Sequence, residues 1–119
     1  MYNHVLHDHL DGGLRPSTAK ILAKQINYLP IVQVDDVAKF FDRSSSTSLD
    51  DYLEAFIHTI ALMQTYDNLE QIAYEAAVDM HKNDIHFYES RYAPFYSVNE
   101  YLSPKDVLTA INSGFKQAE

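Results

Sequence analysis

Two histidines separated by one residue, His7 and His9, follow the short apolar run Val5-Leu6. In a β-strand, residues i and i+2 point to the same face, about 7 Å apart along the backbone. Two imidazoles placed in this way can reach one metal ion, because a zinc–nitrogen bond is only about 2.0–2.1 Å long and the side chains converge. The spacing therefore predicts a strand over residues 4–9 that carries either a metal-binding pair or simply two polar side chains at a strand end.

The residues beside this pair extend the hypothesis. Asp11 continues the face of His7 and His9, so its carboxylate can reach the same pocket; alternatively, it forms a turn before Gly12. Asp8 alternates with the two histidines and is predicted to face away from them, in a helix cap or a salt bridge.

The composition limits the partners that the chain can bind. Its 119 residues include 9 Lys or Arg and 17 Asp or Glu, a formal net charge of −8. This balance argues against a nucleic-acid backbone and against an anionic membrane surface, since both require clustered basic residues. There is no Cys, so a bound metal would be held by His and carboxylate. No apolar run approaches the roughly 18 residues of a membrane helix. Residues 1–4 show no secretory leader, and we expect a cytoplasmic protein.

Hydrophobic spacing predicts an alternation of helices with a second strand. The helices are expected over residues 17–27, 35–41, 67–82 and 103–118, with another that starts at Ser48, and the strand over residues 85–92. Arg15 and His58 are predicted to be exposed. The apolar side of the last helix is predicted to consist of Val107, Leu108, Ile111 and Phe115.

The helix that begins at Ser48 carries a continuous apolar stripe. Its members are Leu49, Tyr52, Leu53, Phe56, Ile57 and Ile60. Taken alone, a stripe at this spacing is typical of a helix that packs against a protein core.

Three segments together resemble the adenosine deaminase family. Residues 7–16, HDHLDGGLRP, resemble its first-strand motif, and residues 88–94, YESRYAP, resemble the end of its second strand. Residues 48–56 look like the helix that lies over the substrate. The three segments occur in the family order and together span most of the chain.

This resemblance implies an α/β fold, the N-terminal portion of a (β/α)8 TIM barrel. Such a barrel takes about 250 residues, so residues 1–119 are expected to hold roughly its first two strands within a metal-dependent hydrolase domain. It also implies the cofactor Zn²⁺, with His7 and His9 as two ligands and His9 close to the substrate. Asp11 would bind a ribose hydroxyl, and an apolar lid over a small-molecule nucleoside would consist of Leu49, Tyr52, Leu53 and Phe56, with Ile57 and Ile60 packed inward.

The implied reaction is hydrolytic deamination of adenosine and deoxyadenosine to inosine. No residue of this chain matches the family's proton donor or its remaining ligands, so we expect the chain alone to be inactive, and to self-associate or to need the rest of the barrel. Two alternatives stay open: a related purine aminohydrolase that acts on adenine or a modified nucleoside, and a non-catalytic helical interaction module.

Overall fold

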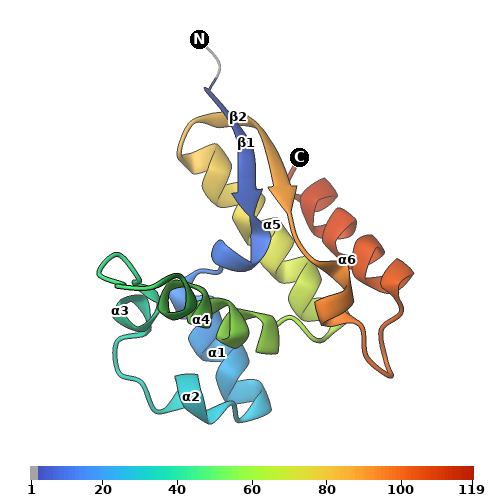
Figure 1. Ribbon diagram of the computed structural model, residues 1–119. Helices are drawn as coiled ribbons and strands as arrows, with labels where there is room; N and C mark the ends of the chain where they lie inside the picture. The colour runs from blue at the N-terminus through green and yellow to red at the C-terminus, as the bar shows by residue number, and fades with distance from the viewer. Residues whose placement is uncertain (1–2) are drawn as a thin grey trace.

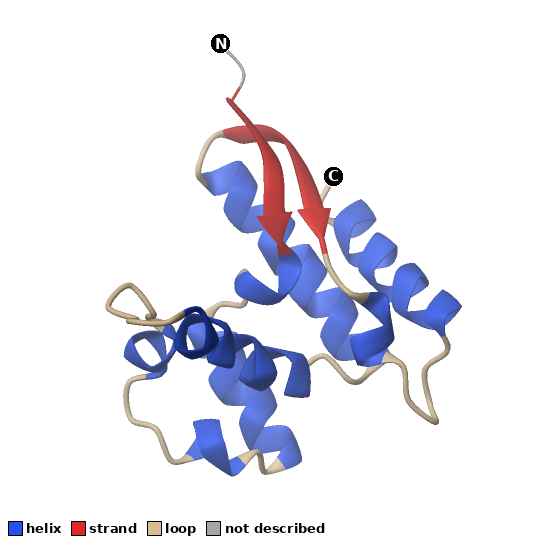
Figure 2. Ribbon diagram, in the orientation of Figure 1, coloured by secondary structure: helices blue, strands red, loops and turns tan. Residues whose placement is uncertain are grey.

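The computed structural model describes residues 3–119 as a helix-rich α/β fold built on two parallel strands (Figures 1 and 2). Strand β1 (Asn3–His9) and strand β2 (Ile85–Arg91) pair directly. The predicted first strand and the predicted second strand are therefore both present, and their parallel pairing is the arrangement expected of neighbouring barrel strands. Residues 1–2, part of the segment searched for a leader, lie outside the described residues.

The helices expected from hydrophobic spacing lie close to their predicted positions. They are α1 (Pro16–Ile26), α3 (Val37–Phe41), α4 (Leu49–Ala61), α5 (Tyr66–Lys82) and α6 (Pro104–Gln117). The short elements η1 (Leu10–Gly12), α2 (Leu29–Val32) and η2 (Pro94–Ser97) complete the set over residues 3–119. None of these helices combines the length and hydropathy of a membrane span.

Side-chain caps fix where four of the helices begin. At α3, Asp36 Oδ1 accepts from the backbone N–H of Lys39 at 3.0 Å. Ser48 Oγ accepts from the backbone N–H of Asp51 at 3.1 Å, as predicted, and Ser103 forms a reciprocal capping box with Asp106. For α5 the predicted start, at residue 67, is one residue late. Thr65 accepts from the backbone N–H of Asn68 and caps a helix that begins at Tyr66.

An irregularity in β1 sets the direction of its side chains. Val5 is paired with Tyr88 and Asp8 with Ser90, so three positions of β1 match two positions of β2. A bulge of this kind reverses the simple alternation of faces. Asp8 consequently lies on the helix-covered face with Ser90, and His9 pairs with Arg91 on the exposed face.

The core lies between the sheet, α5, α6 and the amino-terminal helices. Fully buried side chains that form it include Leu10, Leu22, Ile31, Leu62, Leu69, Ile72, Val107 and Ile111. Helices α5 and α6 run side by side (Figure 1). At Gly114 an added Cβ would lie 2.2 Å from the carbonyl oxygen of Glu70, so the two backbones approach more closely than any larger residue would allow.

Two predictions about single side chains are wrong. Arg15 is not a solvated charge: its guanidinium donates to both carboxylate oxygens of Asp79, at 2.9 and 2.7 Å, and lies 3.7 Å from Glu75. Leu108 is 43% exposed, because α6 buries the side that carries Val107, Ala110, Ile111 and Gly114 instead. Packing against α5 therefore determines which side of α6 is buried.

Candidate metal and nucleoside site

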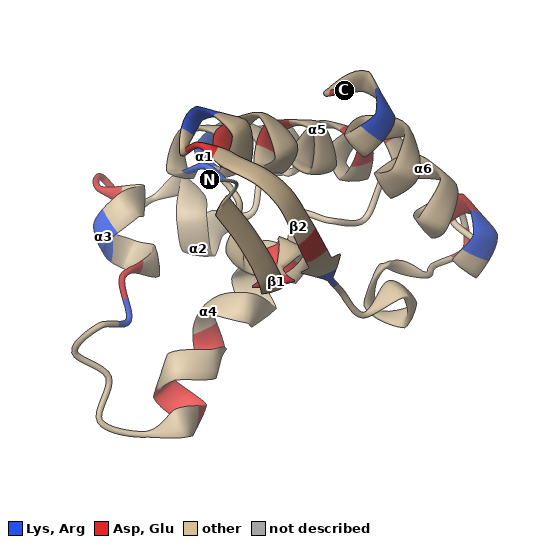
Figure 3. Cartoon of the chain, turned by 90° about the horizontal axis from the view of Figure 1, so that it is seen from above, with Lys and Arg blue, Asp and Glu red and all other residues tan. Residues whose placement is uncertain are grey.

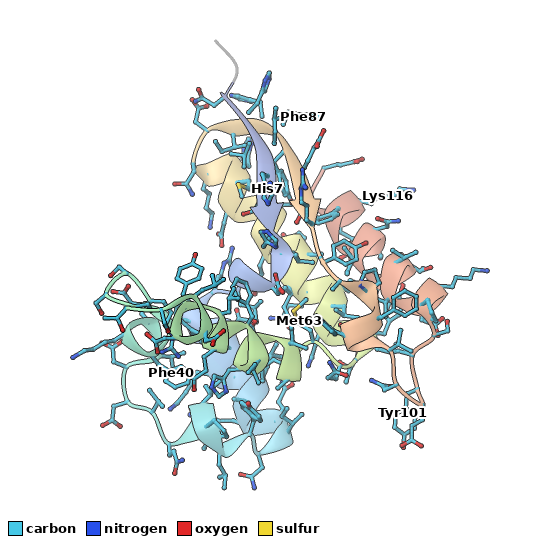
Figure 4. The ribbon with its side chains drawn as sticks, in the orientation of Figure 1. His7, Phe40, Met63, Phe87, Tyr101 and Lys116 are labelled. Carbon is cyan, nitrogen blue, oxygen red and sulfur yellow. The ribbon has the colours of Figure 1, made fainter. Side chains whose placement is uncertain are left out.

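His7 and His9 lie together on the exposed face of β1. Their Nε2 atoms are 3.1 Å apart, and their ring centroids are 5.1 Å apart. Figure 4 shows His7 on strand β1. Both imidazoles thus present a nitrogen to the same small volume, which is the arrangement that one bound cation requires of two ligands.

The pair is not a complete metal site by itself. Within residues 3–119, no group of three or more His, Cys, Asp or Glu side chains could hold a metal ion. Catalytic zinc sites use at least three protein ligands. Two imidazoles alone would therefore form only part of such a coordination shell.

A cleft of about 840 Å³ opens at the carboxyl ends of the two strands; we call it the strand-end cleft. His9 and Asp11 line it from the end of β1, and Tyr92 with Arg91 lines it from the end of β2. Across from them, α4 contributes Tyr52, Leu53, Phe56, Ile57 and Ile60. Active sites of parallel αβ barrels are found at this end of the strands.

Asp11 supplies the buried acidic group of the cleft. Its Oδ1 atom is buried and has no hydrogen-bond partner. Burial raises the pKa of Asp11 above its ordinary value, against the opposing effect of nearby backbone N–H groups and of His9. An unpartnered buried oxygen is costly in a folded protein, so Asp11 is a natural acceptor for a ligand hydroxyl.

Asp8 differs from the prediction made for it. It faces away from the histidines as expected, but none of the caps and ion pairs found over residues 3–119 includes it. Burial raises the pKa of Asp8, and burial together with the charge of Asp8 raises the pKa of Tyr88 to about 12. Two neighbouring hydroxyls, Tyr88 and Ser90, have buried oxygens without partners.

The apolar stripe of α4 is not ordinary core, since much of it is exposed in the described structure. Tyr52, Leu53 and Phe56 reach the strand-end cleft, and the Phe56 ring lies 6.3 Å from the ring of His9. Leu49 is 71% exposed and lies outside the cleft lining. Ile57 was predicted to pack inward, but it is 64% exposed and lines the cleft. A stripe on this helix therefore forms a wall of the cleft.

The prediction that His58 is a surface residue is also wrong. Its Nδ1 atom lies 2.8 Å from the hydroxyl of Tyr28, and its ring centroid is 5.1 Å from that of Phe40. These contacts attach the side of α4 opposite the cleft to α3 and to the segment between α1 and α2. They explain why the apolar side of α4 is left to face the strand ends.

Sequence reasoning missed several residues of the cleft. Arg91, Tyr92 and Tyr96 line it, from the end of β2 and the segment that follows it. The signal was present in the sequence, because Arg91 and Tyr92 belong to the segment at residues 88–94 that ends the second strand.

Comparison with known proteins identifies the family of this chain. The adenosine deaminase family model matches residues 3–119. The chain is similar to adenosine deaminases of Mycobacterium avium (43% identical over 97% of this chain) and Mycobacterium leprae (42% over 97%). It is also similar to adenosine deaminase 1 of Streptomyces coelicolor, 42% identical over 97% of this chain. The chain belongs to the adenosine deaminase family, and it spans about a third of the length of these relatives, 32%, 33% and 30% respectively.

Proposed function

We propose that this chain contributes the first part of a hydrolytic deaminase site that converts adenosine and deoxyadenosine to inosine and ammonia. The observation that carries the proposal is the placement of the two Nε2 atoms, 3.1 Å apart, beside a cleft at the strand ends. Membership of the adenosine deaminase family supports the reaction type. Purine salvage in the cytoplasm is the setting we propose for it.

His7 and His9 are the residues that would hold the metal, which we propose to be zinc. They fit this role because their Nε2 atoms face the same small volume. The chain has no Cys and therefore no thiolate ligand, which leaves imidazole nitrogen and carboxylate oxygen as its zinc ligands. When bound, zinc would lower the pKa of a water molecule toward neutrality. The remaining ligands and the proton donor are proposed to come from residues beyond this chain.

The other side chains of the cleft bind and orient the substrate. Asp11 accepts a hydrogen bond from a sugar hydroxyl through its unpartnered carboxylate oxygen. Tyr52, Leu53 and Phe56 cover the apolar faces of the nucleoside, and Leu49 is proposed to extend this lid at the start of α4. Covering the substrate in this way excludes bulk water from the reacting atoms.

A chimera tests the proposal. Residues 1–119 are joined to the remaining two-thirds of the Mycobacterium avium relative, and inosine formation is compared for the chimera, the relative and the chain alone with added zinc. We expect activity from the chimera and none from the chain alone. His7→Ala and His9→Ala should each lower the activity of the chimera by about 100-fold or more.

Matched controls make the outcome decisive. His81→Ala removes an exposed imidazole on α5 that does not line the strand-end cleft, and it should leave activity unchanged. A chimera with the circular dichroism of the relative but without inosine formation would contradict the proposal. Robust inosine production by the chain alone would instead show that the site is complete within residues 1–119. Comparing adenosine with free adenine separates this reaction from that of a related purine aminohydrolase.

The chain alone is proposed to self-associate. Leu6 and Phe87, exposed by 59% and 51%, lie on its two strands. Exposed strands and apolar side chains favour association. Light scattering is expected to show an oligomer, and a stable monomer at low concentration would contradict this expectation.

A further inference from the structure

A second cavity lies behind the apolar wall of the strand-end cleft. It has a volume of about 390 Å³ and lies between α4 and the segment that follows α3; we call it the Arg43 cavity. The α3 side contributes Arg43 and Ser44, and α4 contributes Ala55 and Thr59, none of which lines the strand-end cleft. The two cavities are therefore formed by largely different side chains.

The two cavities nevertheless meet at shared residues. Asp11, Tyr52 and Phe56 line both of them. A ligand held in the strand-end cleft by a hydroxyl on Asp11 thus has the entrance of the Arg43 cavity directly beside that hydroxyl. A further group attached to the same part of the ligand could enter it.

The polar atoms of the Arg43 cavity indicate what it can hold. The Nε atom of Arg43 is buried and has no hydrogen-bond partner, so a donor is available for a ligand acceptor. The charge of this guanidinium is already engaged, because its Nη1 atom lies 3.8 Å from Asp51 Oδ1 and its Cζ atom lies 5.8 Å from the Phe40 ring centroid.

The remaining charges of the cavity are negative. Asp11 and Asp42 both line it, and the backbone N–H of Ser44 donates to Asp42 Oδ1 at 2.9 Å, which stabilises the ionised carboxylate. The acidic residues that Figure 3 shows on α4 lie outside the cavity lining. A phosphate in the cavity would face the carboxylates of Asp11 and Asp42 without a free cation to neutralise it, whereas an uncharged group would not be repelled.

We propose that the Arg43 cavity extends the nucleoside site and accepts an uncharged substituent, with an acceptor atom for Arg43 Nε, carried by a sugar oxygen next to the hydroxyl that Asp11 binds. The inference rests on the proposed function and specifies its substrate class: sugar-substituted nucleosides are accepted and nucleotides are rejected. Phe41, Ala55 and Phe56 give the substituent an apolar surface.

The test uses the three mono-O-(2-methoxyethyl) ethers of adenosine, one at each sugar hydroxyl, in which the methoxy oxygen supplies the acceptor for Arg43 Nε, and the corresponding monophosphates. Binding to the full chain is followed by ligand-observed NMR, and turnover is measured with the chimera. At least one ether is expected to keep a kcat/KM within about tenfold of that of adenosine. The monophosphate at the same position should be a far poorer substrate.

Two variants fill the cavity from opposite sides. Ala55→Met acts from α4 and Ser44→Leu from the exposed segment after α3, where a change of side chain does not threaten folding. Each should lower kcat/KM for the accepted ether by roughly tenfold or more while adenosine turnover is retained. Ala38→Met, an exposed position on α3 outside both cavities, is the matched control and should change neither substrate.

The outcomes separate this inference from the proposed function. If adenosine is neither bound nor deaminated, the proposed function fails and the inference fails with it. If adenosine is accepted but every ether is rejected, or if the filling variants affect adenosine and the ether equally, the inference alone is overturned. Acceptance of the monophosphate as readily as the ether would also overturn it.

Discussion

Replacing Gly114 by Ala tests the contact between α6 and α5 that supports the sheet. An added Cβ would lie 2.2 Å from the Glu70 carbonyl oxygen and 2.9 Å from the Tyr74 backbone nitrogen. Both are backbone atoms, so no side-chain rotation relieves the contact. To regain an ordinary separation of about 3.5 Å, the helices would have to move apart by on the order of 1 Å.

Two opposing effects decide the magnitude. Overpacking a close contact costs about 1–3 kcal/mol, whereas Gly→Ala within a helix contributes about 1 kcal/mol of stability. The first effect is expected to be at the upper end of its range, because α6 cannot shift without disturbing Val107, Ala110 and Ile111, all of which are fully buried. We therefore expect a net loss of about 1–2 kcal/mol in the free energy of unfolding.

Urea denaturation followed by circular dichroism measures this loss. Asn112→Ala, at an exposed position of the same helix, is the control and should stabilise the chain slightly, by about 0.5 kcal/mol, through helix propensity alone. If Gly114→Ala stabilised the chain as much as Asn112→Ala does, the close contact between the helices would not exist and the reasoning would be refuted.

Two further predictions follow from contacts that the sequence did not indicate. The guanidinium of Arg15 holds the pKa of Asp79 below its ordinary value of 3.8, so the ion pair stabilises the fold above that pH and loses its effect as the pH falls through the lowered pKa. Arg15→Met should therefore lower the free energy of unfolding by at most about 1 kcal/mol at neutral pH, and its difference from the parent chain should vanish in acid. Thermal unfolding at a series of pH values measures this, and a difference that does not depend on pH would be evidence against the ion pair. Tyr28→Phe removes the hydroxyl that lies 2.8 Å from His58 Nδ1 and should cost about 0.5–1.5 kcal/mol, with faster amide hydrogen exchange in α4. Unchanged exchange in α4 would show that this contact does not hold the helix.

The helix starts were the most predictable part of the fold. Ser48 and Ser103 cap helices through hydrogen bonds to residues three positions away. The relevant partners are therefore visible in a short stretch of sequence. The same applies to His7 and His9, whose convergence depends on a spacing of two residues within one strand.

The surroundings of the site were less predictable. The bulge between Val5 and Asp8 depends on the register with β2, some 80 residues away in the chain, and it decides which face of the sheet receives the histidines. Nothing in a pattern of alternating residues indicates such a change of register.

By itself, the sequence determined the two strands, the helices α1, α3, α4, α5 and α6, the histidine pair and the family motifs, because each depends on residues that are neighbours along the chain. The tertiary structure decided which sides of these elements are buried and which line the cleft. Contacts of His58 with Tyr28 and of Arg15 with Asp79 join residues 30 and 64 positions apart. Packing at such separations depends on the shapes of whole helices, and it alone turned the apolar side of α4 toward the strand ends and left a second cavity behind it.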